Sequence, residues 1–160
     1  MAYANYDNEV GYVQGMNYIV ALLLFYLPDQ EENIFWGLHQ LMQHRNWRLV
    51  YTHNFPKLKS ITTLLENRIQ SEYPKVLKHM KANYMEVEGT FSPHFMTLYV
   101  YLTPVEIATR LFEIFLLDGE SALLRLLLKM IAVKQKQILS MNDMELQHYL
   151  LSGMVIECIE

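Results

Sequence analysis

The feature that most constrains the fold of this chain is the spacing of its apolar residues, which is helical over almost the whole length. Apolar side chains recur three and four positions apart, and no segment shows the alternation of a half-buried strand. Only six glycines and five prolines are present, too few for the many turns of an all-β fold. The sequence therefore predicts an all-α fold, a single domain with roughly two-thirds of its residues in helices.

Helix boundaries are predicted from the residues that favour helix starts and stops. The segment Gly15–Leu27 is apolar almost all round, which predicts a helix buried in the core, and Pro28 ends it. Thr103 is predicted to cap a helix with Pro104 in its first turn, and Gly119 to end that helix. Further helices are predicted at 29–44 with Asp29 as cap, from Asn54 past Ile69, at 95–102, at 121–139 and at 140–151. Pro74 leaves open one kinked helix or two, and Glu86–Pro93 is predicted to break the pattern.

Composition excludes several classes of function. A net charge of −4 argues against a nucleic-acid-binding surface, and the single cysteine, Cys158, excludes an internal disulfide. The longest apolar run, Tyr18–Leu27, is much shorter than the roughly 20 residues of a membrane-spanning helix. No phosphate-binding Gly-x4-Gly-Lys-Ser/Thr loop is present, and we expect no cofactor. We also expect no metal site, because the six histidines lack the spacing of metal ligands: His39, His44, His53, His79, His94 and His148.

The segment Gly11–Ile19, with the sequence GYVQGMNYI, has an order that helical periodicity does not require. Two glycines flank a Tyr-x-Gln, and the apolar run begins directly after them. Glycine next to a helix start permits a positive φ or close backbone approach, and a glutamine amide offers one acceptor and two donors. The segment is typical of a loop that leads into a helix and presents an amide side chain to a partner, although a plain helix start is a common alternative.

Three segments, in order, resemble the TBC domain of GTPase-activating proteins for Rab GTPases. Residues 2–7 and 10–17, AYANYD and VGYVQGMN, are similar to its Tyr-x-Gln segment. Residues 91–99, FSPHFMTLY, resemble its Trp-Phe-x-Thr-Leu-Phe, with His94 in place of the tryptophan. Residues 108–113, ATRLFE, followed by Asp118-Gly119, resemble Arg-Ile-Trp-Asp and a closing glycine. The resemblance covers most of the chain and implies an all-helical TBC-type fold.

The resemblance also implies roles for individual residues. Gln14 corresponds to the glutamine that positions the attacking water during GTP hydrolysis by the partner, so the chain would be an activator without a substrate of its own. Tyr12 would brace the loop, Gly15 would allow close approach of the partner, and Met16 and Asn17 would complete the partner-binding segment. The implied partner is a GTP-bound Rab, with a role in vesicle trafficking and intracellular protein transport in the cytoplasm, peripheral to endomembranes.

One element of the family's site has no counterpart in this sequence. The family supplies an arginine from an Ile-x-x-Asp-x-x-Arg segment upstream of the Tyr-x-Gln. None of the arginines in this sequence lies three residues after an aspartate; they are Arg45, Arg48, Arg68, Arg110 and Arg125. Residues 1–160 are therefore interpreted as a partial TBC domain without its N-terminal subdomain, and weak stimulation of hydrolysis is expected. If the chain is fully active, Arg45, Arg48 or Arg110 must act instead.

Two readings remain open from sequence alone. The chain is either an incomplete Rab activator or a non-catalytic helical module that binds a Rab or another partner. The first reading predicts that Gln14 is accessible at the start of a helix, with Tyr18, Ile19, Leu22 and Leu23 buried behind it.

Overall fold

The computed structural model describes residues 2–101 and 103–159, which form helices and, within those ranges, no strand. The all-α prediction is confirmed. In chain order, the helices are α1 (Ala2–Tyr6), α2 (Met16–Tyr26), α3 (Glu31–His44), the 3₁₀ helix η1 (Trp47–Val50), α4 (Pro56–Glu72), α5 (Pro74–Ala82), α6 (Val87–Met96), α7 (Val105–Asp118), α8 (Glu120–Ile138), α9 (Asp143–His148), the π-helical segment η2 (Tyr149–Gly153) and α10 (Met154–Ile159).

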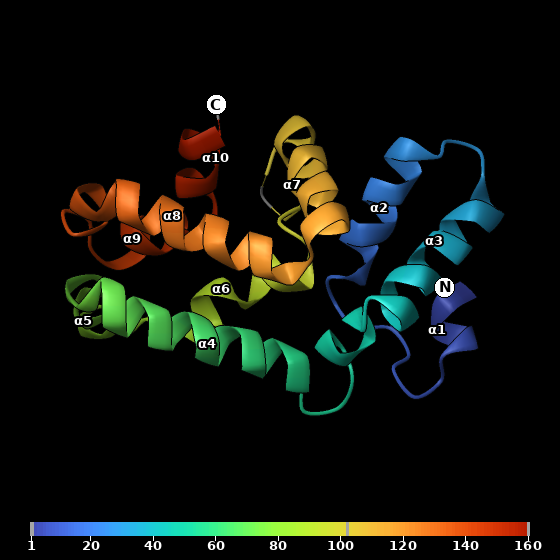
Figure 1. Ribbon diagram of the computed structural model, residues 1–160, viewed down its shortest axis with the longest axis horizontal. Coiled ribbons are helices and arrows are strands. Elements are labelled where there is room, and N and C mark those ends of the chain that lie inside the picture. The colour runs from blue at the N-terminus through green and yellow to red at the C-terminus, as the bar shows by residue number, and fades with distance from the viewer. Residues whose placement is uncertain (1, 102, 160) are drawn as a thin grey trace.

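Two groups of helices meet at α7. Helix α4 packs against both α6 and α8, with η2 against α6 and α10 against α8, and helices α1, α2 and α3 form the other group. Figure 1 shows α7 standing between α8 and α2, and α7 contacts both of these helices. The loop between α1 and α2 lies at the lower end of α2 in this view, where the chain from η1 also passes.

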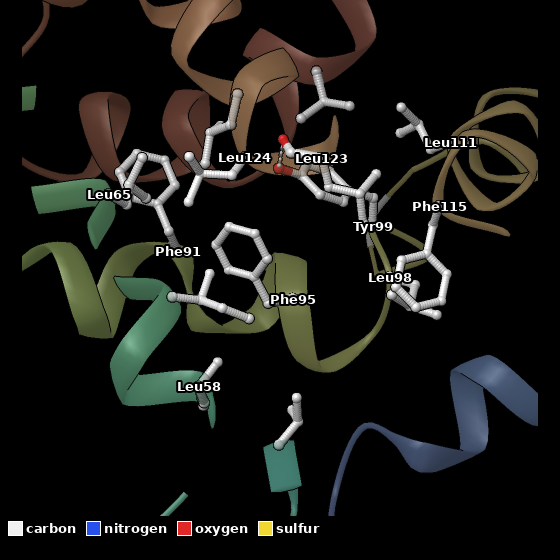
Figure 2. Close-up of a cluster of buried hydrophobic side chains, with 14 of the residues drawn as sticks. Leu58, Leu65, Phe91, Phe95, Leu98, Tyr99, Leu111, Phe115, Leu123 and Leu124 are labelled. Atoms are coloured by element: carbon white, nitrogen blue, oxygen red, sulfur yellow. Dashed lines mark hydrogen bonds between the residues drawn. The ribbon is translucent and has the colours of Figure 1, made fainter. Parts of the chain in front are cut away.

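One continuous core connects the helices. Figure 2 shows its central cluster, in which side chains from α4, α6, the turn after α6, α7 and α8 converge: Leu58, Leu65, Phe91, Phe95, Leu98, Tyr99, Leu111, Phe115, Leu123 and Leu124. The Tyr99 hydroxyl donates a hydrogen bond of 3.4 Å to the Leu123 carbonyl, so the ring is buried without losing its polar partner. Burying each such side chain stabilises the fold by about 1.5–3 kcal/mol.

Proline and glycine define several helix boundaries, as predicted at Pro56 and Gly119, while at Pro74 the structure decides between the two alternatives that the sequence left open. Pro56 and Pro74 each occupy the first turn of a helix, where a missing N–H costs nothing, so the segment around Pro74 forms two helices. Gly119 ends α7 with a φ of 77°, a conformation that glycine adopts without strain.

The largest error of the sequence prediction concerns α6. Glu86–Pro93 was predicted to break the helical pattern and 95–102 to be a helix, but the helix runs from Val87 to Met96 and includes Pro93. Val87, Phe91 and Phe95 lie four residues apart and are all buried, and this packing outweighs the roughly 3 kcal/mol cost of an internal proline. Leu98 and Tyr99 then turn the chain with positive φ values of 49° and 65°. The last residue of the predicted 95–102 helix, Leu102, lies outside the described residues.

Predicted caps were also wrong. The residues before α3, α4 and α7 are Gln30, Phe55 and Pro104, and none of these helices has a side-chain cap hydrogen bond. Asp29 and Asn54 lie one position before the N-cap residues and have positive φ, while the Thr103 hydroxyl donates to the Tyr101 carbonyl. The predicted helix at 140–151 divides into α9 and η2, and α10 follows.

Helix α2 is buried on one face only, which corrects the prediction of a core helix. Ile19, Leu22 and Leu23 are buried, whereas Leu24 and Phe25 are 46% and 60% exposed. The reason is tertiary, because α3 and α7 cover α2 on one side and the described residues leave the other side open. No helix in the described residues is long and apolar enough to cross a membrane.

Candidate functional site

Gln14 lies on the loop of residues 7–15, here called the Gln14 loop, which joins α1 to α2. Its side chain is exposed and forms no hydrogen bond with the described residues. Gln14 therefore presents its amide to solvent directly before the first turn of α2, as predicted. Ile19, Leu22 and Leu23 are buried behind it as predicted, but Tyr18 is only half-buried because its ring stacks edge-on against Tyr101 near the surface.

Asn17 ties the Gln14 loop to the first turn of α2. Its Oδ1 atom accepts a hydrogen bond of 3.2 Å from the Tyr12 hydroxyl and one of 3.3 Å from the backbone N–H of Gly15. These two donors lie on either side of Gln14 in the sequence. The Asn17 side chain therefore links Tyr12, which precedes Gln14, to Gly15, which follows it.

Gly15 anchors the end of the loop against the turn after α6. With a φ of 110°, Gly15 adopts a conformation that residues with a Cβ rarely take. A Cβ atom at this position would lie 3.4 Å from the Met96 carbonyl oxygen and 3.6 Å from Thr97. The same Met96 carbonyl accepts a hydrogen bond from the Tyr51 hydroxyl. The fold therefore brings two of the resembling segments, 10–17 and 91–99, into contact.

The start of the loop is held by an ion pair that sequence reasoning did not identify. The Arg48 guanidinium donates from Nε to Asp7 Oδ2 at 2.6 Å and from Nη2 to Asp7 Oδ1 at 2.8 Å. Nη2 also donates to Glu9 Oε2 at 2.7 Å. The pair joins residues 41 positions apart, so no local sequence signal could reveal it.

The charges at this ion pair are strongly coupled. Hydrogen bonding from Arg48 holds the pKa of the Asp7 carboxyl below its usual value, and the two carboxylates raise the pKa of Arg48. Burial, together with the charge of Asp7, raises the pKa of the Tyr3 hydroxyl to about 12, and this hydroxyl donates to Asp7 at 3.2 Å. Asp7 is therefore a fully ionised acceptor at neutral pH.

The other arginines named in the sequence analysis lie elsewhere. Arg110 is exposed, and its neighbour Thr109 accepts a hydrogen bond from Tyr26 at the far end of α2, about 15 Å from the end that carries Gln14. Arg45 donates to the backbone carbonyl of Leu116. Neither arginine is placed beside Gln14 by these contacts.

His94 belongs to the core. Its ring is 4% exposed and stacks at centroid distances of 5.6 Å and 5.0 Å from Phe91 and Tyr99. Burial lowers the pKa of His94 to about 4, so the imidazole is neutral at physiological pH. This agrees with a packing role in place of the family's tryptophan.

A groove of about 580 Å³ adjoins the Gln14 loop. Helices α1, α2 and α3 form its walls, and Tyr12 and Asn17 contribute to its rim at the loop. Most of its remaining lining is apolar: Ala2, Tyr3, Ala4, Met16, Val20, Ala21, Leu24, Ile34, Phe35 and Leu38, with Glu31. Tyr12, Gln14 and Asn17 are exposed at this corner, whereas Gly15 and Met16 are buried. Among the described residues, no three His, Cys, Asp or Glu side chains gather as metal ligands would.

Comparison with known proteins identifies the family to which the chain is similar. The family model described as Rab-GTPase-TBC domain matches residues 1–139. The human protein "Ecotropic viral integration site 5 protein homolog" is 33% identical over 92% of this chain and 18% of its own length. The Caenorhabditis elegans "Rab GTPase-activating protein eat-17" is 33% identical over 74% of the chain and 13% of its own length. The Drosophila melanogaster "Ecotropic viral integration site 5 ortholog" is 31% identical over 90% of the chain and 18% of its own length.

The chain thus spans less than a fifth of the length of these relatives. The matched residues include the Gln14 loop, the turn after α6 and helix α7, which are the three segments that first indicated the resemblance. This chain therefore belongs to the Rab-GTPase-TBC domain family.

Proposed function

We propose that the chain is part of a GTPase-activating domain for Rab GTPases and that Gln14 contributes directly to GTP hydrolysis by the partner. Spontaneous hydrolysis is slow because the attacking water is poorly positioned and the charge that develops on the phosphoryl oxygens is not neutralised. A glutamine amide can address the first task, since it both donates to and accepts from water.

The observation that carries this proposal is the presentation of Gln14. Its side chain is exposed and uncommitted, while Asn17 accepts hydrogen bonds from the Tyr12 hydroxyl before it and the Gly15 N–H after it, and Gly15 also lies against Met96. A rigid loop with a free amide limits the entropy lost when that amide engages a water in the partner's nucleotide site. Tyr12 and Asn17, also exposed, would border the contact with the Rab.

Charge neutralisation requires a cation in addition to Gln14. Arg48 is held by Asp7 and Glu9, Arg45 is held by Leu116, and Arg110 lies toward the far end of α2. An arginine at such a site contributes about 10³- to 10⁵-fold in rate. We therefore propose that a segment carrying Asp-x-x-Arg, outside these 160 residues, completes the site.

Single-turnover hydrolysis by a panel of GTP-loaded Rabs tests the proposal. The 160-residue chain should stimulate hydrolysis little, and a form extended at its N-terminal side by an Asp-x-x-Arg segment should stimulate one or more Rabs by several powers of ten. Full activity of the 160 residues alone would instead place the cation among Arg45, Arg48 and Arg110. If the extended form stimulates none of the Rabs, the proposal is wrong.

The second candidate is a helical module that binds its partner without accelerating hydrolysis. The apolar groove beside the Gln14 loop favours it, because such a surface can bind a partner whether or not Gln14 reaches the nucleotide. Binding of a GTP-loaded Rab by the extended form, without stimulation, would support this reading.

A further inference from the structure

Arg48 binds both acidic side chains at the start of the Gln14 loop. Asp7 follows α1 directly and is 8% exposed, and Glu9 lies two residues later and is 78% exposed. Arg48 comes from η1, a different part of the chain, and is itself mostly buried, with 21% of its side chain exposed. The contact to Asp7 uses both carboxylate oxygens in the planar geometry that a guanidinium favours.

Asp7, which Arg48 holds in place, in turn hydrogen-bonds to the backbone of the Gln14 loop. Its Oδ1 atom accepts from the Val10 N–H at 3.4 Å, and its backbone carbonyl accepts from the Gly11 N–H at 2.8 Å. Gly11 then turns the chain with a φ of 64° toward Tyr12 and Gln14. A shift of Asp7 would therefore move the turn that directs the chain to Gln14.

The charge balance argues against a role for Arg48 as a cation offered to a partner. Two carboxylates surround one guanidinium, so the cluster carries a net charge of −1 and its Nε and Nη2 donors are already engaged. Using Arg48 elsewhere would leave Asp7 buried and unpaired, which is costly.

We infer that Arg48 is a positioning residue, which fixes the start of the Gln14 loop through Asp7 and Glu9 and thereby sets where Gln14 is presented. Its effect on the loop is independent of the proposed function, whereas its effect on hydrolysis rests on that function. The Gln14 loop is then held at both ends by separate elements, by η1 through Arg48 and by the turn after α6 through Gly15.

Amide hydrogen exchange on the 160-residue chain tests the structural part. In Arg48→Lys, which keeps the charge but loses the two-pronged contact, amides of residues 10–15 should exchange at least about tenfold faster, while those in α4 and α8 keep their protection. Glu9→Gln removes only the negative charge at the exposed contact, which weakens the charge-assisted bond from Arg48, and should give a smaller change in the same direction. Arg68→Gln, which breaks an exposed ion pair with Glu72 within α4, is the matched control and should leave the loop unchanged.

Two exchange results would overturn the inference. One is loop exchange in Arg48→Lys no faster than in Arg68→Gln. The other is an equal acceleration in every helix, which would show that Arg48 only stabilises the fold. Because Glu9 is exposed, Glu9→Gln will fold even if Arg48→Lys does not, and an unchanged loop in Glu9→Gln would then count against the inference.

Hydrolysis by the extended form described above tests the catalytic consequence. Arg48→Lys should lower kcat about ten- to hundredfold with little change in KM, because a misplaced catalytic group loses its effect on the chemical step. In a Gln14→Ala background the same substitution should have almost no further effect on kcat. Additive losses would contradict positioning through Gln14. If the extended parent itself is inactive, the proposed function fails, while the exchange result still decides the role of Arg48.

Discussion

Gly15 lies so close to Met96 that a Cβ atom on Gly15 would be 3.4 Å from the Met96 carbonyl oxygen and 3.5 Å from the Met96 Cβ. The two residues belong to segments about eighty positions apart in the sequence, and each segment resembles a different part of the family's pattern. The glycine is therefore required by its φ of 110°, whereas a Cβ atom would lie in ordinary van der Waals contact with Met96.

Replacing Gly15 should weaken the fold. Gly15→Ala is expected to lower the free energy of unfolding by about 1–3 kcal/mol, because alanine is strained at a φ of 110°. Gly89→Ala is the matched control, since Gly89 lies in α6 with nothing within 4 Å of an added Cβ. It should stabilise the chain by about 0.5–1 kcal/mol. Urea denaturation measures the free energy of unfolding of both variants. Equal effects of the two substitutions would contradict the requirement for glycine at position 15.

Replacing Gln14 should affect hydrolysis and leave stability unchanged. In the extended form, Gln14→Ala should reduce the stimulated rate by about 10² or more, as expected for the loss of one positioned transition-state group. The glutamine of the Rab itself would limit this loss, so the effect should be smaller than that of removing the arginine. Gln70→Ala, at an exposed position on α4, is the control and should be silent in both assays. Full activity of the Gln14→Ala variant would contradict the proposed role of Gln14 in GTP hydrolysis.

Replacing Asn17 should loosen the loop around Gln14. Asn17→Ala removes the acceptor for Tyr12 and Gly15 and should cost about 0.5–1.5 kcal/mol of stability, with faster amide exchange at Gly15. Asn17→Asp keeps an acceptor oxygen and should retain most of the protection. Asn67→Ala, exposed on α4, controls for the loss of an asparagine. Protection at Gly15 that survives Asn17→Ala would show that this contact does not hold the loop.

His94 should make the fold sensitive to mild acid. Its pKa is lowered from 6.5 to about 4 by burial, so below pH 6.5 the unfolded chain binds a proton that the folded chain does not. The free energy of unfolding should therefore decrease as the pH falls from 6.5 to 4, by about 3 kcal/mol in all. The carboxyls of Asp7 and Glu157, whose pKa values are lowered from 3.8 and 4.5, add to the decrease only near the acid end of this range, where the unfolded chain begins to bind their protons.

Urea denaturation at several pH values checks this dependence. His94→Phe removes the titrating group while keeping an aromatic ring between Phe91 and Tyr99, and should flatten the curve between pH 6.5 and 4. His148→Gln, at an exposed position, should retain the slope of the parent chain. If the pH dependence of the free energy of unfolding is unchanged in His94→Phe, His94 does not cause the loss of stability in mild acid.

Sequence alone was sufficient for the helical class, for the helix start at Pro56, for the end of α7 at Gly119, and for the exposure of Gln14, whereas it left open whether a new helix begins at Pro74. These features depend on local chemistry. An apolar period of three to four residues, a proline without an N–H and a glycine that tolerates positive φ act within a few residues of chain. The three segments that resemble the TBC family could also be recognised from the sequence, because their residue order can be compared with the family pattern without a structure.

Tertiary structure decided the rest, since it depends on residues that are distant in sequence. Helix α6 continues through Pro93, because burial of Val87, Phe91 and Phe95 in the assembled core outweighs the local effect of the proline. Which side of α2 is exposed depends on where the neighbouring helices pack. A segment that is apolar all round does not specify which side they will cover. The hold of Arg48 on Asp7 and the fit of Gly15 against Met96 exist only after the chain has folded, because each joins elements whose approach is set by the packing of the whole core.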